Sequence, residues 1–246
     1  MKKLIATLIA ATSIASVQAG ETIRFGMEAT YPPFEFIGDN NQIEGFDVDL
    51  ANAICQELKA ECSFNNQPFD SLIPSLKFRR FDAIISGMDI TPARQKQVDF
   101  SQPYYENSAI FIAKKDTLDS IDQLKGKSVG VQNGSTHQQY VIDKLEANGV
   151  TVRPYDSVQN AFLDMTSGRV NAVFADTAVA NEWMTEKGEG QYQHVGAEIK
   201  NPEYFGIGYG IAVRKGNELK GKIDVALNTL KNNGTYQKIQ NKYFAN

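Results

Sequence analysis

Short apolar runs alternate with helical patterns along most of the chain, and this alternation limits the folds that the sequence can adopt. The apolar runs typical of buried strands are residues 22–27, 81–86, 108–113, 128–131 and 210–213. The segments that predict helices are residues 46–58, 135–147, 157–165, 177–186, 219–230 and 236–243. Such alternation is typical of α/β domains, and the nearly continuous apolar runs predict mostly parallel sheets.

Part of this pattern occurs twice. Residues 76–85 (LKFRRFDAII) align with residues 165–174 (MTSGRVNAVF) at an offset of 89 positions, and a weaker match pairs residues 23–26 with residues 128–131. Two interpretations are open: helix–strand units resemble one another in general, or the chain forms two lobes on one plan. In the second case the strand ends of both lobes face a common cleft, where open α/β sheets bind their ligands.

The N-terminal segment is typical of an export signal. Two lysines precede an uncharged apolar run over residues 4–14, and the sequence VQA at residues 17–19 suits a signal peptidase. We therefore expect residues 1–19 to be a signal peptide that is cleaved after Ala19, which places the mature chain outside the cytoplasm. Direct membrane insertion is not expected, because a bilayer span needs about 20 apolar residues.

Charge and composition narrow the partners. The full chain carries a formal charge of −4, and removal of the two lysines in the signal segment makes it −6. An acidic chain with scattered charges disfavours nucleic acid and anionic lipid as partners and suits a cationic ligand. Neither His137 nor His194 has a metal-ligating neighbour at a useful spacing, so we expect no metal and no cofactor. We expect His137 to be a polar helix residue.

The chain contains two cysteines, Cys55 and Cys62. An even number of cysteines in an exported chain favours one disulfide that closes a short loop, and the alternative is two unrelated buried thiols. A bridge over so short a loop would restrict the unfolded chain only modestly.

The first two strand-end loops carry aromatic and acidic residues. Pro32 and Pro33 stiffen a turn that holds Tyr31 as a face for a flat cation. The alternative for Tyr31 is core packing. Glu28 either pairs with a cationic ligand or is a solvated loop acid. Phe69 is either an opposing aromatic wall or a hydrophobic staple at a helix start.

The third loop, after the run at 81–86, suits a carboxylate. Gly87 lets the backbone approach a ligand closely, and Arg94 lies in a short helix that begins at Thr91-Pro92. Arginine is well shaped for two-pronged capture of a carboxylate, although a surface ion pair is the commoner role of a single arginine.

The fourth loop and the repeated strand end complete a site for a zwitterion. Ser135 and Thr136 open a helix whose free N–H groups suit an anion. Asp176 either binds an ammonium group or caps the helix that follows it. We predict that Arg94 and the turn at the helix start take the carboxylate of the ligand, while Asp176, with Asp89, takes its ammonium group.

The same segments carry a family resemblance. The matching motifs are TYPPF at 30–34, EGFDVDLA at 44–51, FDAI at 81–84, TPxR at 91–94 and GTY at 234–236. They identify the chain as a member of the polar amino-acid-binding proteins of ABC importers, over essentially the whole mature chain. Within this family, residues 86–89 and 104–108 look like those of the arginine-binding subgroup.

The resemblance implies the α/β fold of the type II periplasmic binding proteins, in which two Rossmann-like lobes are joined by a two-strand hinge with the ligand cleft between them. By analogy with the family, residues 20–109 and 204–246 form the first lobe, and residues 110–203 form the second. Cys55 and Cys62 match a disulfide pair of the lysine–arginine–ornithine type.

The resemblance also assigns roles within the cleft. The implied ligand-binding residues are Glu28, Tyr31, Phe69, Ser86, Gly87, Asp89, Arg94, Gln132, Ser135, Thr136 and Asp176. Two aromatic rings sandwich the ligand side chain, and Glu28 and Gln132 reach its end. Ser86, Gly87 and Asp89 join Asp176 at the ammonium group. Asp89 departs from the serine or threonine that is common there in relatives.

We therefore expect a periplasmic monomer that captures L-arginine and delivers it to the membrane permease of an ABC transporter by an open–closed hinge motion. The alternatives are another polar amino acid (lysine, ornithine, histidine or glutamine) or an exported dehydratase on the same fold. An enzyme is not favoured, because every acid–base candidate at a strand end has another explanation.

Overall fold

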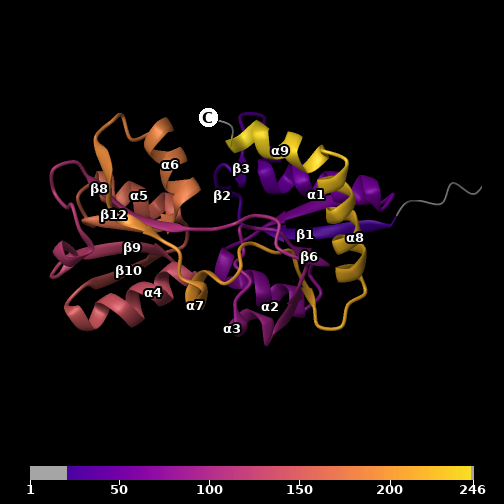
Figure 1. Ribbon diagram of the computed structural model, residues 1–246, viewed down its shortest axis with the longest axis horizontal. Coiled ribbons are helices and arrows are strands. Elements are labelled where there is room, and N and C mark those ends of the chain that lie inside the picture. Colours follow the sequence, from indigo (N-terminus) through magenta and orange to yellow (C-terminus); the bar gives the residue numbers. More distant parts are fainter. Residues whose placement is uncertain (1–20, 245–246) are drawn as a thin grey trace, which may run out of the picture.

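The computed structural model describes residues 21–244, and the expected signal peptide at 1–19 lies outside these residues. The described chain forms two lobes side by side, each with a five-stranded sheet and helices packed against it (Figure 1). The chain crosses from the first lobe to the second before β8 and returns before β13. None of the described helices has the length and apolarity needed to cross a bilayer.

The first lobe is built on the sheet of order β5-β1-β6-β13-β7. Its strands are β1 (Thr22–Met27), β5 (Glu61–Asn66), β6 (Ala83–Ile84), β7 (Val98–Phe100) and β13 (Ala212–Arg214). Its helices are α1 (Phe46–Glu57), α2 (Leu72–Lys77), α3 (Pro92–Gln95), α8 (Leu219–Asn232) and α9 (Thr235–Phe244), with the 3-10 turn η1 (Phe69–Ser71) before α2. A small antiparallel sheet follows β1 and contains β2 (Thr30–Tyr31), β3 (Glu35–Ile37) and β4 (Ile43–Glu44).

The second lobe is built on the sheet of order β10-β9-β11-β8-β12. Its strands are β8 (Ala109–Lys114), β9 (Ser128–Gln132), β10 (Thr151–Tyr155), β11 (Ala172–Asp176) and β12 (Tyr192–Ile199). Its helices are α4 (Thr136–Leu145), α5 (Val158–Thr166), α6 (Thr177–Glu186) and α7 (Pro202–Phe205), with the 3-10 turns η2 (Ile121–Leu124) and η3 (Glu146–Asn148). The two crossings between the sheets lie near the expected lobe boundaries. The boundaries themselves remain a prediction.

Both sheets follow one plan. The order β5-β1-β6-β13-β7 in the first lobe corresponds strand for strand to β10-β9-β11-β8-β12 in the second. The repeat at an offset of 89 positions covers the end of α2 with β6, and the end of α5 with β11. The interpretation as two lobes on one plan is therefore the correct one.

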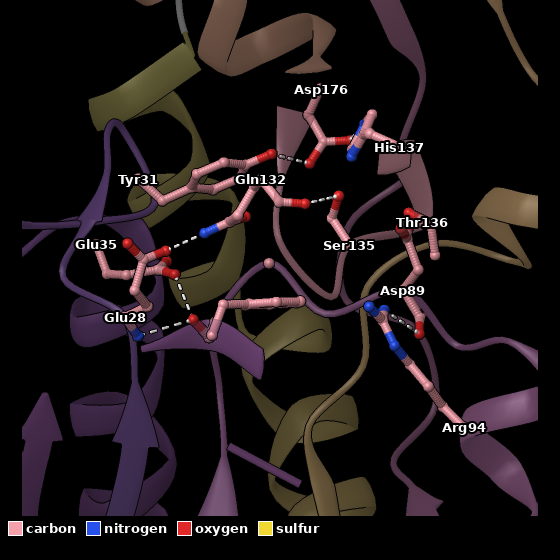
Figure 2. A pocket seen from close by; sticks show the side chains of 13 residues that line it. Glu28, Tyr31, Glu35, Asp89, Arg94, Gln132, Ser135, Thr136, His137 and Asp176 are labelled. Atoms are coloured by element: carbon pink, nitrogen blue, oxygen red, sulfur yellow. Dashed lines mark hydrogen bonds and ion pairs between the residues drawn. The ribbon is translucent and has the colours of Figure 1, made fainter. Parts of the chain in front are cut away.

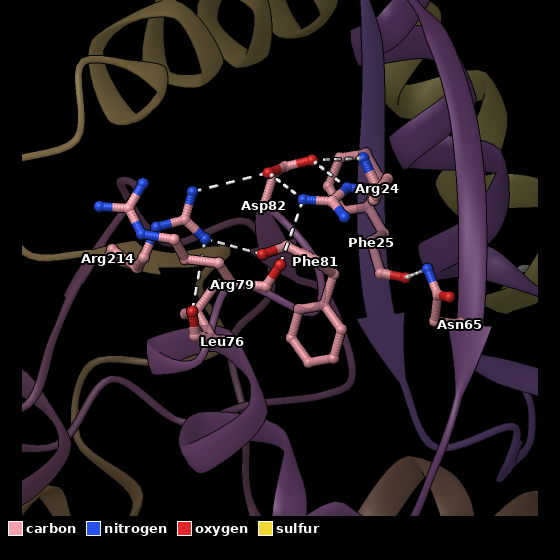
Figure 3. Close-up of polar contacts among 8 residues, drawn as sticks. All are labelled: Arg24, Phe25, Asn65, Leu76, Arg79, Phe81, Asp82 and Arg214. Carbon is pink, nitrogen blue, oxygen red and sulfur yellow. Dashed lines mark hydrogen bonds and ion pairs between the residues drawn. The ribbon is translucent and has the colours of Figure 1, made fainter.

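An aspartate and an asparagine occupy equivalent places before β6 and β11. Asp82 accepts from the backbone N–H of Arg24 (3.1 Å), and Asn171 accepts from that of Ser128 (2.9 Å). In the first lobe, Asp82 also binds the guanidinium of Arg24 (2.9 Å) and lies 3.5 Å from that of Arg214 (Figure 3). Each side chain thus links the start of its own strand, β6 or β11, to the neighbouring strand, β1 or β9, at the end of the sheet away from the cleft.

The weaker sequence match, which pairs residues 23–26 of β1 with residues 128–131 of β9, is one position away from the structural correspondence. Gly26 lies opposite Ile84, and Gly130 lies opposite the equivalent Val173, so the two glycines correspond. A Cβ atom at Gly26 would lie 2.4 Å from the Phe81 ring. The equivalent positions are therefore the glycines, over which other residues pack closely, and not the positions that the apolar runs align.

The expectation of mostly parallel sheets holds for strand direction, because one strand in each sheet runs opposite to the other four. β1 pairs in parallel with β5 and β6, whereas β13 pairs antiparallel with β6 and β7. The second sheet repeats this pattern, with β9 parallel to its neighbours and β8 antiparallel to both β11 and β12. The antiparallel strands β8 and β13 arrive from the other lobe. Each therefore starts at the cleft edge, where strands such as β11 end, and Ala109 pairs with Asp176.

An aromatic cluster supports the loop that follows β1. Phe34 is fully buried, and its ring lies edge-on to Phe46 (6.0 Å), Tyr105 (4.9 Å) and Tyr209 (5.2 Å). Edge-to-face contacts at these spacings stabilise a core beyond the burial of apolar area. Core packing thus explains Phe34 and fixes the loop that carries Tyr31 to the cleft.

The predicted disulfide is confirmed. Cys55 near the end of α1 is bonded to Cys62 in β5, with a Cα–Cα distance of 5.9 Å. The bridge holds the carboxyl end of α1 against an edge strand of the first sheet, whose pattern is polar and only partly buried.

Replacing both cysteines with serine is expected to lower the free energy of unfolding by about 2–3 kcal/mol. The bridge spans a sequence separation of 7, and its loss restores the freedom of a short loop in the unfolded chain. Urea unfolding followed by circular dichroism measures the change. Wild-type protein unfolded with a reducing agent should show the same lower midpoint, and an unchanged midpoint in both samples would contradict the prediction.

Candidate ligand-binding site

A pocket lies where strands of both sheets end (Figure 2). All the residues predicted to bind the ligand line it, together with Glu35 and His137. The predicted lining residues are Glu28, Tyr31, Phe69, Ser86, Gly87, Asp89, Arg94, Gln132, Ser135, Thr136 and Asp176. Within residues 21–244, no group of His, Cys, Asp and Glu side chains is arranged to hold a metal ion.

Arg94 reaches the pocket from α3 with its charge buried. The Thr91 hydroxyl caps this helix by accepting from the Arg94 N–H, and only 9% of the Arg94 surface is exposed. The guanidinium donates to the carbonyl oxygens of Asp89 (3.1 Å) and Gly134 (3.4 Å) and lies 5.3 Å from the centre of the Phe69 ring. It forms no ion pair in the described part of the chain. The interpretation as a surface ion pair is therefore wrong, and the geometry suits a ligand carboxylate.

The start of α4 forms the wall of the pocket opposite Arg94. Ser135 is the N-cap, and its Oγ accepts from the Gln138 N–H (3.1 Å) and donates to the Gln132 carbonyl (2.6 Å). The Thr136 hydroxyl donates to the Asp89 carboxylate across the pocket (2.7 Å). The first N–H groups of a helix have no intrahelical acceptor, so this helix start also suits an anion.

Asp176 supplies a buried negative charge at the end of β11. It occupies the N-cap position of α6, but its side chain makes no capping hydrogen bond. Instead it accepts from the hydroxyls of Tyr31 (2.5 Å) and Tyr209, and its other oxygen lies 3.0 Å from Nε2 of His137. Burial alone would raise the pKa of Asp176, but His137 and the two hydroxyls hold it below the usual range. The capping interpretation is therefore wrong.

Asp89 connects the two lobes. One of its oxygens accepts from Asn107 Nδ2 (2.9 Å) and the other accepts from the Thr136 hydroxyl (2.7 Å). Burial and the nearby charge of Asp176 raise the pKa of Asp89 to about 7, although Arg94 acts against the rise. Contact between Asp89 and a ligand ammonium group stays a prediction.

The other end of the pocket combines an acid and an amide. Glu28 is only 4% exposed, so it is not a solvated loop acid. It accepts hydrogen bonds from the Thr30 hydroxyl and from Nε2 of Gln132. Burial raises the pKa of Glu28 to about 7, although both hydrogen bonds act against the rise. Tyr31 and Phe69 line the same pocket and offer flat faces to a planar cation.

Ser86 and Gly87 form the wall at the end of β6. The Ser86 Oγ accepts from the backbone N–H of Glu28 (3.0 Å) and donates to Glu35 (2.7 Å). Gly87 has a φ of 47°, which favours glycine, and its N–H donates to the Asp47 carboxylate (3.0 Å).

Two lining residues were not predicted from the sequence. His137 lies in α4 as expected, but it is only 4% exposed, lies beside Asp176 and packs edge-on to Phe174 (5.1 Å). Its place in the first turn of a helix at a strand end was a usable signal. Glu35, the first residue of β3, is fully buried, but an acid directly after Phe34 gives no sign of this in the sequence.

Hydrogen bonds across the pocket join the lobes. The bonded pairs are Tyr31–Asp176, Glu28–Gln132, Asp89–Thr136 and Asp70–Asn133. In each pair one partner belongs to the first lobe and the other to the second, so the lobes are closed around the pocket in this structure.

The chain belongs to the bacterial extracellular solute-binding proteins, family 3, whose family model matches residues 23–246. It is 57% identical over 246 residues to the putative ABC transporter arginine-binding protein 2 of Escherichia coli K12, covering 99% of each chain. It is 54% identical over 245 residues to the ABC transporter arginine-binding protein 1 of the same organism, again covering 99% of each chain.

Solved structures agree with this assignment. A Salmonella typhimurium periplasmic binding protein described as highly specific for arginine is 47% identical, with a TM-score of 0.88 over 92% of this chain and 100% of that one. An ancestral arginine-binding protein bound to arginine is 44% identical, with a TM-score of 0.86 over 92% of this chain and 100% of that one. The two-lobed α/β fold of the type II periplasmic binding proteins and the resemblance to arginine-binding members of ABC transporters are thus confirmed.

Proposed function

We propose that this chain binds L-arginine between its lobes and delivers it to the membrane permease of an ABC transporter. The layout of charge in the pocket carries the proposal. The Arg94 guanidinium forms no ion pair within the described chain, while the acids Asp176 and Glu28 lie elsewhere on the pocket wall. These three charges complement the carboxylate, ammonium and guanidinium groups of arginine. The names of the two Escherichia coli relatives support the same ligand.

The pocket walls suggest one orientation for the ligand. Its carboxylate binds Arg94 and the start of α4, and its ammonium group binds Asp176 and Ser86. Its guanidinium lies between the rings of Tyr31 and Phe69 and donates to Glu28. Stacking of a planar cation on aromatic rings, together with buried charge-assisted hydrogen bonds, accounts for the roughly 8 kcal/mol that micromolar binding requires.

The binding residues come from both lobes, so the full set of ligand contacts exists only when the lobes are closed. A ligand that binds one conformation better shifts the population toward it. We propose a hinge between a first lobe of residues 20–109 and 204–246 and a second of residues 110–203, with the permease recognising the closed form. The protein acts as a monomer in the periplasm after cleavage at Ala19.

The proposed role is that of a binding protein and not of an enzyme. A solved ancestral amino-acid-binding protein, described as a precursor of cyclohexadienyl dehydratase, shares the fold at 34% identity and a TM-score of 0.81, so the fold itself allows catalysis. The acid–base candidates here are both engaged, however. Glu28 accepts from Thr30 and Gln132, and His137 lies against Asp176.

Titration calorimetry on refolded, ligand-stripped protein tests the proposed function. Arginine is expected to bind more tightly than lysine, ornithine, histidine and glutamine, because only its planar cation matches both the aromatic rings and the Glu28–Gln132 end. The panel separates the alternatives: preferred binding of another amino acid would replace the proposed ligand, and the absence of binding by all five would refute an amino-acid receptor. Product formation on incubation with a dehydratase substrate would refute a pure binding role.

Arginine affinity is expected to rise with pH between about 5.5 and 7 and then to level off. Burial in the closed conformation raises the pKa of Glu28 to about 7, so below this pH the acid must lose a proton to pair with the ligand cation. One such proton changes affinity by up to about tenfold per pH unit. Calorimetry across this range measures the slope, and Glu28→Gln should flatten it. An identical slope in that variant would contradict the assignment to Glu28.

A further inference from the structure

We propose that Glu35 and Asp47 share one proton and thereby fix the Ser86 hydroxyl as a hydrogen-bond acceptor toward the ammonium group of the ligand. The part that concerns the ligand rests on the proposed function, whereas the shared proton does not. Glu35 lies beside Glu28 at the wall of the pocket (Figure 2). Asp47 lies behind it in the first turn of α1.

The hydrogen-bond pattern around the two acids leaves one oxygen of each without a donor. Glu35 Oε1 accepts from Ser86 (2.7 Å), while Asp47 Oδ2 accepts from the Gly87 N–H (3.0 Å) and the Tyr104 hydroxyl (2.9 Å). Glu35 Oε2 and Asp47 Oδ1 are buried and receive no hydrogen bond within residues 21–244. Both residues are fully buried, and each carboxyl group is close enough to shift the pKa of the other. A single proton between the two free oxygens satisfies both of them.

Within residues 21–244, no cationic side chain pairs with either acid to stabilise two negative charges. The groups that face the pair are Glu28, after β1, and the phenols of Tyr104 and Tyr236. None of the described ion pairs includes Glu35 or Asp47. Two adjacent carboxylates in such a site cannot both ionise, so one stays protonated at neutral pH.

The proton belongs on Glu35. Burial raises the pKa of Asp47 to about 7, but Asp47 accepts two hydrogen bonds on one oxygen that act against this rise, whereas Glu35 accepts only one. Burial and the charge of Asp47 raise the pKa of Glu35 well above its usual range. Glu35 therefore donates to Asp47 and keeps its other oxygen as the acceptor for Ser86.

This arrangement decides what the wall offers to a ligand. The Ser86 hydroxyl gives its proton to Glu35 and accepts from the Glu28 N–H, so only an acceptor lone pair is left for the pocket. The Gly87 N–H is likewise taken by Asp47. At Ser86 and Gly87 the wall therefore presents a hydroxyl acceptor, with the hydroxyl proton and the Gly87 N–H already used, which suits an ammonium group. Glu35 and Asp47 act as positioning residues.

Urea unfolding of four proteins tests the shared proton: wild type, Glu35→Gln, Asp47→Asn and the double variant. Each single variant keeps one donor and one acceptor between the two side chains, because the introduced amide donates to the remaining carboxylate. In the double variant two amide NH2 groups face each other. We expect the unfolding equilibrium constant of each single variant to stay within about tenfold of wild type, and that of the double variant to exceed the product of the single changes by roughly tenfold or more.

Two outcomes of this cycle would overturn the proposal. If both carboxyl groups were ionised, each single variant would remove repulsion and stabilise the protein strongly. If the groups did not interact, the effects of the two substitutions would simply add. Glu57→Gln, an exposed substitution on the same helix as Asp47, controls for the loss of a negative charge and should leave the unfolding midpoint unchanged.

The pH dependence of unfolding gives a second readout, which a merely structural role would not change. Because its folded pKa is raised, Glu35 keeps its proton in the folded state where the unfolded chain has lost it. The stability linked to this proton is fully present below the unfolded pKa, near 4.3, and falls as the pH rises toward the folded value. Between pH 6 and 8 the wild-type unfolding constant should therefore rise about tenfold more per pH unit than that of Glu35→Gln. Equal slopes would refute the shared proton.

Calorimetry with arginine tests the orientation of Ser86. Glu35→Ala frees the serine hydroxyl to point its proton at the ligand, so we expect at least about tenfold weaker binding, of which Glu35→Gln should restore most. Equal losses in the two variants would refute the positioning role. If the wild type bound no arginine, the proposed function would fail, while the unfolding experiments would still decide whether the proton is shared.

Discussion

Replacing Arg94 with alanine is expected to weaken arginine binding roughly 30- to 5,000-fold. Removing one partner of a buried, hydrogen-bonded charge pair costs about 2–5 kcal/mol, which sets this range. Arg94 is the buried guanidinium at the proposed carboxylate end, and it forms no ion pair within the described chain. Its removal would leave the ligand carboxylate in a closed pocket without a counter-charge. Titration calorimetry gives the affinity directly.

The free protein should keep its stability in this variant, because Arg94 donates only to two carbonyl oxygens in the structure. Thermal unfolding without ligand separates loss of binding from loss of fold. Arg94→Lys retains the charge but lacks the two-pronged donor geometry, so its affinity should fall between those of wild type and Arg94→Ala. Lys96→Ala removes an exposed positive charge after the same helix and should leave binding unchanged. Wild-type affinity in Arg94→Ala would refute the proposed orientation of the ligand.

Replacing Asp176 with asparagine is expected to weaken arginine binding roughly 30- to 1,000-fold, or about 2–4 kcal/mol. The change removes the buried charge that faces the proposed ammonium group and keeps nearly the same shape. An amide oxygen can still accept from the Tyr31 and Tyr209 hydroxyls, which donate to Asp176 in the structure. The effect should therefore appear in affinity and not in the fold.

The matched control for this variant is Glu186→Gln, which removes a negative charge at the exposed end of α6, the helix that follows Asp176. It should bind arginine as the wild type does. Calorimetry of both variants, with thermal unfolding of the ligand-free proteins, makes the comparison. An Asp176→Asn protein that is folded and binds with wild-type affinity would show that the ammonium group binds elsewhere.

Part of this molecule could be predicted because it depends on local sequence. The strand at residues 22–27 and the helix at residues 177–186 have the predicted bounds, because an apolar run or a helical spacing sets them directly. Strands β5, β10 and β12 were not predicted. Each is at an edge of its sheet and largely exposed or half-buried, so its sequence lacks an apolar run.

The repeat and the family motifs placed the candidate binding residues at strand ends, and the structure brings them all to one pocket. They could not show the environment of each side chain. Glu28 is buried because Gln132, from the other lobe, lies over it, and Asp176 turns away from its own helix because Tyr31 and Tyr209 donate to it. These partners lie between 33 and 145 positions away in the sequence.

Local spacing along the chain set the α/β class and put the candidate binding residues at strand ends, because apolar periodicity and short motifs depend on near neighbours in the sequence. The two matching sheets were needed to show that the repeat means two lobes on one plan. Only the tertiary structure decided strand direction in β8 and β13, the burial of His137 and Glu35, and the pairing of Glu35 with Asp47. Burial and pKa depend on which distant segments pack together, and no local pattern of residues records that contact.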